Sequence, residues 1–248
     1  MPINMMDIQK AVVKKALRNG HLDIIMDLHE INKDLFIQSE DEYEDEDEHD
    51  DAYYYCKIAA FHGHLKCLKY LHENGCSWYA CTCSNAAFNG HFECLKYAHE
   101  NGCPWNEYTC ADAARYGHIK CLKYAHKNGC PWDNWVCYWA AENGHLECIK
   151  YAHENGCPWD NWAYYQAVKK NHIECIKWFH ENGCPCTKNF LSIIVKKILI
   201  PKWRAAIKSR QIVIYWMELG AQTSCAENGR ARMEDKKLFE NNFNNLLV

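Results

Sequence analysis

A Gly-His pair that returns every 27 residues constrains this chain more than any other feature of its sequence. The pair begins at Gly63, Gly90, Gly117 and Gly144, and Asn171 takes the fifth place. A fixed period of this length is typical of solenoid proteins, in which each unit buries its apolar face only against its neighbours. The period therefore predicts one elongated array of repeats in place of separate globular domains.

Each unit is predicted to contain two helices. In the second unit, residues 79–89 carry small side chains on one side, where a neighbouring helix can approach closely. Gly90 is expected to end this helix, because glycine adopts the left-handed conformation without a steric penalty. The second helix is predicted over 92–101, with an apolar stripe at three-residue spacing, and Gly102 and Pro104 stop it. The expected fold class is all-α, a solenoid of stacked helix-turn-helix repeats.

The regular array is expected to have irregular ends and one insertion. Ten acidic residues crowd between Glu40 and Asp51, and their mutual repulsion predicts a solvated, mobile segment. It acts either as a spacer that keeps the protein soluble or as a bait for a basic partner. The predicted segments are a degenerate first repeat (1–38), the acidic disordered insertion (39–51), five repeats (52–186), a degenerate final repeat (187–221) and a C-terminal capping helix or tail (222–248).

Most of the 17 cysteines recur at fixed repeat positions, which indicates a packing role. Equivalent residues of stacked units would lie roughly 8 to 10 Å apart, whereas a disulfide needs Cα atoms within about 7 Å. We therefore expect free thiols in a reducing compartment. The three ladders are Cys67, Cys94, Cys121, Cys148 and Cys175; Cys76, Cys103, Cys130, Cys157 and Cys184; and Cys56, Cys83, Cys110 and Cys137.

Neither a signal peptide nor a membrane span is predicted. Residues 1–19 lack a sufficient apolar run, and Lys196 and Lys197 interrupt the apolar stretch at 190–200. We expect a monomeric, cytoplasmic protein with no membrane partner.

The run Ala-Ala-x-x-Gly-His-Leu-Glu-Cys-Leu-Lys-Tyr, followed by Glu-Asn-Gly-Cys, resembles the ankyrin repeat from roughly Ala16 to Ala221. Two features depart from that family: its period is 33 residues, and its Thr-Pro-Leu-His opening is missing here. The six missing residues should come from the β-hairpin finger and leave a tight Cys-Pro-Trp connector. Such short units look like those of giant DNA viruses and some protists. The resemblance implies a scaffold that binds a partner protein, in the host cytoplasm if the protein is viral.

Metal and catalytic chemistry are not expected. His64, Cys67, His72 and Cys76 lie in one unit, but Cys67 and His72 are about 140° apart around a helix and do not converge on one ion. A catalytic Cys-His pair would be a single pair, whereas these residues recur in every unit. We predict structural histidines at turns and helix ends, no metal, no cofactor and no enzyme activity.

A lysine ladder beside an aromatic ladder raises the alternative of nucleic-acid binding. However, a glutamate follows four residues after most of these lysines on the same helix face and compensates the charge. We therefore predict a solvated outer face and no nucleic-acid partner. The lysines are Lys69, Lys96, Lys123, Lys150 and Lys177, and the glutamates are Glu73, Glu100, Glu154 and Glu181.

Positions that change from unit to unit are free of packing duties, and they gather in the first helix near the Gly-His turn. In ankyrin repeats, the positions just before this turn line the concave surface that contacts partners. Aromatic residues and arginine are typical of interface hot spots. The alternative is that some of these aromatics merely fill the space left by the missing fingers. The candidate partner-binding residues are Phe88, Asp112, Arg115, Tyr116, Tyr138, Trp139, Glu142, Tyr165 and Lys169.

Two functions remain open from the sequence. The first is a binding scaffold whose concave surface captures a partner protein, such as a host factor of a large virus. The second is an adaptor, in which the C-terminal region recruits a ubiquitin ligase or another machine. No recruiting motif is recognisable in residues 187–248.

Overall fold

The structure of the chain is a computed structural model that describes residues 5–36 and 51–184, with side chains described from Tyr54 onward in the second range. All of these residues belong to one compact unit, Met1–Pro185. The predicted final repeat (187–221) and the C-terminal tail (222–248) lie outside the described residues, as does the acidic insertion except at its end. Helix α3 begins at Asp51, the last residue assigned to that insertion.

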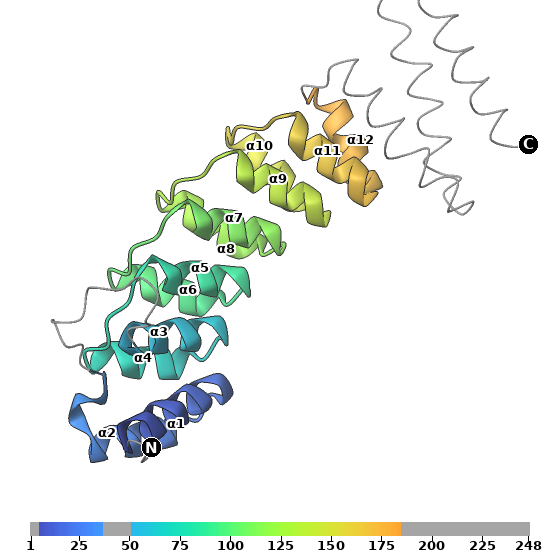
Figure 1. The fold of residues 1–248 in the computed structure, drawn as a ribbon. Coiled ribbons are helices and arrows are strands. Elements are labelled where there is room, and N and C mark those ends of the chain that lie inside the picture. The colour runs from blue at the N-terminus through green and yellow to red at the C-terminus, as the bar shows by residue number, and fades with distance from the viewer. Residues whose placement is uncertain (1–4, 37–50, 185–248) are drawn as a thin grey trace, which may run out of the picture. The chain divides into compact units, whose positions relative to one another are not determined.

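The described residues fold into twelve α-helices and one short 3-10 helix, and they contain no strand, which confirms the all-α prediction. The helices form consecutive antiparallel pairs that stack in layers (Figure 1). They are α1 (Met5–Asn19), α2 (Leu22–Ile31), η1 (Lys33–Phe36), α3 (Asp51–Phe61), α4 (Leu65–Glu73), α5 (Ala80–Phe88), α6 (Phe92–Glu100), α7 (Glu107–Arg115), α8 (Ile119–Lys127), α9 (Asn134–Asn143), α10 (Leu146–Glu154), α11 (Asn161–Lys170) and α12 (Ile173–Glu181).

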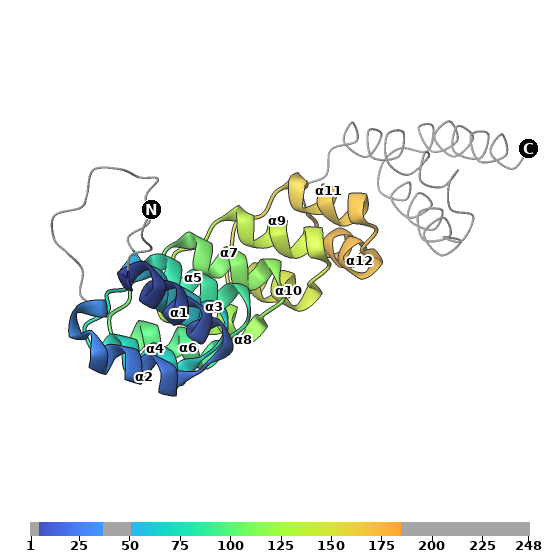
Figure 2. The same ribbon diagram turned by 60° about the horizontal axis from the view of Figure 1, so that its bottom comes forward.

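Two rows of helices result from this stacking. The odd-numbered helices form the first row and the even-numbered helices the second (Figures 1 and 2). The first-row helices pack more closely on one another than the second-row helices do, because buried alanines such as Ala113 and Ala114 keep little bulk between them.

The Gly-His turn joins the two helices of a unit and also locks neighbouring units together. Gly117 has φ +75°, and a Cβ at this residue would lie 2.5 Å from Nδ1 of His145 in the next unit. His145 donates from its ring to the carbonyl of Arg115, and burial lowers its pKa. Asn171 keeps the left-handed turn with φ 67°.

A second histidine ladder stabilises the second row. His126 stacks on Trp132 with ring centroids 3.8 Å apart, and its Nδ1 lies 2.8 Å from the hydroxyl of Tyr151 in the next unit. His72 and His99 repeat the stack on their own tryptophans. These histidines are structural, as the sequence predicted, and the tyrosines beside the lysine ladder are part of the packing.

The lysine ladder is neutralised by a different pattern from the one predicted. Only one of the expected pairs four residues apart is seen among the described ion pairs, Lys96–Glu100 at 3.9 Å. Lys150 instead pairs at 3.1 Å with Glu147, three residues earlier. The ammonium of Lys123 lies 5.4 Å from the ring centroid of Tyr151.

The fifteen cysteines within the described residues are free thiols. Cys157 donates to the carbonyl of Asp133 at 3.1 Å, which ties its connector to the preceding one. Burial raises the pKa of Cys148 to about 12. Two ladders meet inside the four units that carry both, and in the second of these units a hydrogen bond between the side chains of Cys83 and Cys103 raises the pKa of Cys83 well above its usual range. Spacing within each single ladder did not predict this contact.

Candidate protein-binding surface

The outward face of the first-row helices carries the side chains that differ most between units. Because consecutive first-row helices run in the same direction, their first turns align along one edge of the face and their last turns along the other. The small residues of these helices point into the core instead. The exposed face is thus free to vary without disturbing the stack.

Several predicted residues form one continuous aromatic strip across α5, α7 and α9. The ring centroids of Phe88 and Tyr116 lie 4.0 Å apart. The Arg115 guanidinium lies 4.2 Å from the ring centroid of Trp139 and 5.5 Å from that of Tyr116. Tyr138 continues the strip in edge contact with Trp139 at 4.9 Å.

Other predicted residues are held by neighbouring units. Gln166 donates to the Tyr138 hydroxyl at 2.6 Å, and Glu142 forms an ion pair with Lys170 at 3.5 Å. Tyr138 is half-buried and bonded to the next unit, so packing between units is part of its role. Variation between units does not by itself leave a side chain without contacts.

Three further predicted residues lie at the margins of the strip. Burial raises the pKa of Asp112 to about 6, against the opposing influence of Arg115. Tyr165 contacts Trp162, with ring centroids 5.7 Å apart, and Lys169 is exposed.

The most exposed aromatics of this face were not among the predicted residues. Tyr108 is 62% exposed, Trp135 49% and Trp162 54%. They occupy the same position in successive units, one that reads Tyr54, Cys81, Tyr108, Trp135 and Trp162 along the chain. The variation of this position was an available signal, but the position lies in the first turn of the helix, at the opposite end from the Gly-His turn near which the partner-binding residues were predicted.

Two neighbouring slots open between the first turns of these helices. The α9–α11 slot has a volume of about 430 Å³, and the α7–α9 slot about 230 Å³. Trp135 lines both. The α9–α11 slot is lined by Asn134, Trp135, Tyr138, Asp160 and Trp162; the α7–α9 slot is lined by Glu107, Tyr108, Ala111, Asp133, Trp135 and Trp139.

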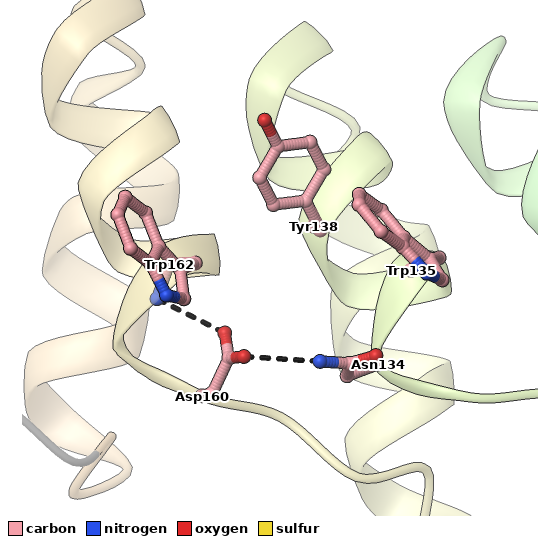
Figure 3. A pocket seen from close by; sticks show the side chains of 5 residues that line it. All are labelled: Asn134, Trp135, Tyr138, Asp160 and Trp162. Atoms are coloured by element: carbon pink, nitrogen blue, oxygen red, sulfur yellow. Dashed lines mark hydrogen bonds between the residues drawn. The ribbon is translucent and has the colours of Figure 1, made fainter.

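A carboxylate lies at the end of the α9–α11 slot. Figure 3 shows Trp162 and Tyr138 on either side of the slot and Asp160 joining the two helices. Asp160 caps α11 by accepting from the backbone N–H of Trp162 at 2.9 Å, and its second oxygen accepts from Asn134 at 3.0 Å. Asp133 caps α9 in the same way through Trp135 at 3.0 Å. The helix N-termini are therefore already satisfied by carboxylates.

Neither slot has the ligand set of a metal centre. Across residues 5–36 and 51–184, no three His, Cys, Asp or Glu side chains lie close enough together to hold an ion. In the same ranges, no helix combines the length and apolar character needed to cross a membrane. The chemistry of the face is that of aromatic rings, amides and carboxylates.

Comparison with known proteins identifies the repeat family. Residues 110–190 match a profile of ankyrin repeats in three copies, and residues 56–99 match a profile of ankyrin repeats in many copies. The repeats are ankyrin repeats. The two matches together span about half of the chain and include α5, α9, α11 and all but the first three residues of α7.

A solved ankyrin-repeat structure supports the same fold. The crystal structure of the human ASB11 ankyrin repeat domain superimposes with a TM-score of 0.56 at 18% sequence identity, covering 71% of this chain and 85% of that chain. At this identity, the likeness concerns the fold alone. The comparison with curated proteins found no match. Ankyrin repeats are typically interaction modules without catalytic activity, and they suggest a protein partner.

Proposed function

We propose that this protein is a scaffold that binds a partner protein through the exposed face of α5, α7, α9 and α11. The observation that carries this proposal is the row of exposed aromatics at Tyr108, Trp135 and Trp162, beside the strip built around Arg115 and Trp139. Tryptophan, tyrosine and arginine dominate the energetic hot spots of protein interfaces. Scattered exposed apolar residues need no explanation, but a contiguous group is typical of an interaction site.

The contacts within the face support binding by a prearranged surface. Arg115 is held over Trp139, and Tyr138 is fixed by Gln166. Side chains that are ordered before binding lose less conformational entropy when the partner arrives. The stacking of rigid units holds the same side chains at a fixed spacing.

The short units resemble those of giant DNA viruses, so we propose a host protein as the first class of partner to test. The adaptor function predicted for the C-terminal region depends on residues outside those described, and no observation favours it.

The proposal is tested by affinity purification from host lysate with three forms of the full chain. They are the unaltered protein, the double variant Arg115→Glu/Trp139→Ala, and Lys120→Glu as a control. Lys120 is exposed on the second-row helix α8, so its reversal matches the charge change of Arg115→Glu on the opposite face. All three are checked by circular dichroism.

A partner captured by the unaltered chain and by Lys120→Glu, but lost from the double variant, supports the proposal. Hot-spot side chains typically contribute ~2 kcal/mol or more each, so the loss should be near complete. Equal capture by the folded double variant would refute binding through this face.

A further inference from the structure

The two slots indicate the chemistry of what the face binds. Each combines aromatic walls with at least one carboxylate, and no lysine, arginine or histidine lines either slot. Within the described part of the chain, no ion pair involves Glu107, Asp133 or Asp160. A cation over the face of a tryptophan or tyrosine is attracted by the ring quadrupole, and a nearby carboxylate adds to that attraction.

An anionic ligand would not find suitable partners in these slots. The first-turn N–H groups of a helix ordinarily attract anions, but here the N–H groups of Trp135 and Trp162 already donate to Asp133 and Asp160. An anion would therefore meet carboxylates instead of free donors. The negative charge of these carboxylates therefore disfavours a negatively charged ligand.

The chain itself already places cations over aromatic rings of this face. Tyr54 occupies in its unit the position of Trp135 and Trp162, 27 residues apart in successive repeats. The ammonium groups of Lys14 and Lys57 each lie 5.3 Å from its ring centroid.

Neither slot has a lysine equivalent to Lys57, whose ammonium lies over the Tyr54 ring. The position of Lys57 becomes Ala111 in the unit of Tyr108 and Tyr138 in the unit of Trp135. The aromatic residues are thus retained without that lysine, while the Arg115 guanidinium lies 4.2 Å from the ring centroid of Trp139, which lines the α7–α9 slot.

We propose that the α7–α9 and α9–α11 slots each bind a lysine or arginine side chain of one extended segment of the partner protein. This inference rests on the proposed function of the face. Neighbouring packed helices lie roughly 8 to 10 Å apart. Polyproline-II segments rise ~3.1 Å per residue with three residues per turn, so basic residues three positions apart lie on one side at a matching distance. The segment carries a basic-x-x-basic pattern.

A direct test uses two labelled peptides that differ only in charge. The first has the core Lys-Pro-Pro-Lys with glycine flanks, and the second has glutamine in place of both lysines. Binding to the full chain is followed by fluorescence anisotropy at low salt. We expect the unaltered protein to bind the lysine peptide at least about tenfold more tightly, in keeping with the cation–π and charge attraction. No preference for the lysine peptide would overturn the inference.

Two variants separate the slots from the other acidic groups of the chain. Asp133→Asn/Asp160→Asn removes two charges while asparagine remains a good N-cap, so the fold is retained. Trp135→Ala removes the ring shared by both slots but leaves every carboxylate in place. We expect the preference for lysine to fall at least about fivefold in each variant.

A preference that survives in both variants would assign it to other acidic residues, such as the ten between Glu40 and Asp51, and would refute the slots as the site. The lysate experiment with Arg115→Glu/Trp139→Ala answers a different question. If the double variant loses the partner in that experiment but the peptides show no lysine preference, the proposed function stands and only the inference of a basic partner segment is refuted.

Discussion

Replacement of Gly117 by alanine tests how neighbouring units are locked together. Two effects are expected to add. Alanine in the left-handed region costs about 1 to 2 kcal/mol. In addition, the new methyl group would lie 2.5 Å from Nδ1 of His145, so the imidazole must move away and lose its hydrogen bond to the Arg115 carbonyl. Loss of such a bond costs about 1 kcal/mol.

Gly129 provides a matched control within the same unit. Its φ is +84°, and a Cβ there would meet nothing within 4 Å. Gly129→Ala should therefore show the backbone strain alone, about 1 to 2 kcal/mol, whereas Gly117→Ala should lose about 1 kcal/mol more.

The assay is urea unfolding of the full chain, followed by far-UV circular dichroism at constant protein concentration. A double-mutant cycle with His145→Ala completes the design, because removal of the imidazole leaves the methyl group nothing to displace. In that background, Gly117→Ala and Gly129→Ala should cost the same. Equal losses in the presence of His145, or an unchanged difference in its absence, would refute the locking role of this contact.

Two further predictions concern the pH dependence of stability and the replacement of a half-buried or an exposed tryptophan. Burial lowers the pKa of several histidines below the value of 6.5, so their neutral form stabilises the fold above about pH 6.5 and this contribution is lost as the pH falls through and below that value. The pKa of Asp112 is raised to about 6, so this residue takes up a proton in the same pH range and opposes the effect of the histidines. The Asp112→Asn variant removes that opposing effect, and its unfolding temperature should decrease from about pH 7.5 to about pH 5.5. A constant unfolding temperature over this range would contradict the stabilising role of the neutral histidines. The histidines are His72, His91, His99, His126 and His145. Trp132→Ala should cost about 2 kcal/mol or more, because Trp132 stacks on His126, whereas Trp135→Ala should cost less than about 1 kcal/mol because the side chain is 49% exposed. Equal losses in urea unfolding would show that Trp135 is a packing residue.

The helices could be predicted from the sequence almost to the residue. The predicted first helix of the second unit, 79–89, is observed as Ala80–Phe88, and 92–101 is observed as Phe92–Glu100. This agreement has a physical cause, because Gly90 and Gly102, both in the left-handed conformation, follow these two helices at a fixed point. Repetition of the same signals removes the ambiguity that a single copy would leave.

Contacts between different positions of the repeat could not be predicted in the same way. A constant position shows that a residue packs, but not which other position it meets. His145 packs against Gly117 of the preceding unit, and the thiols of Cys83 and Cys103 meet within one unit. Both pairs join columns that change at most once over the five repeats, so comparison of the units with one another carries little signal for the pairing.

The candidate surface shows the limit of the same comparison for variable positions. Variation singled out Tyr138 and Trp139, yet Tyr138 is bonded to Gln166 of the following unit and Trp139 lies under Arg115 of the preceding one. Variable residues of adjacent helices face each other, so they can form pairs specific to one interface between units. Exposure, which the sequence does not give, identified Trp135 and Trp162 instead.

The division between constant and variable positions locates binding in one part of the array. The packing of Gly117 against His145 recurs along the stack, with Gly63 against His91 and Gly90 against His118, so these units share the same support. The aromatic first-turn position does not recur uniformly: it is Cys81 in α5, and in α3 it is Tyr54, already covered by two lysines. Among the described helices, α7, α9 and α11 combine an exposed aromatic first turn with the two slots. A partner segment that follows the two slots would therefore lie across these three helices, and the glycine-histidine packing of the earlier units supports them.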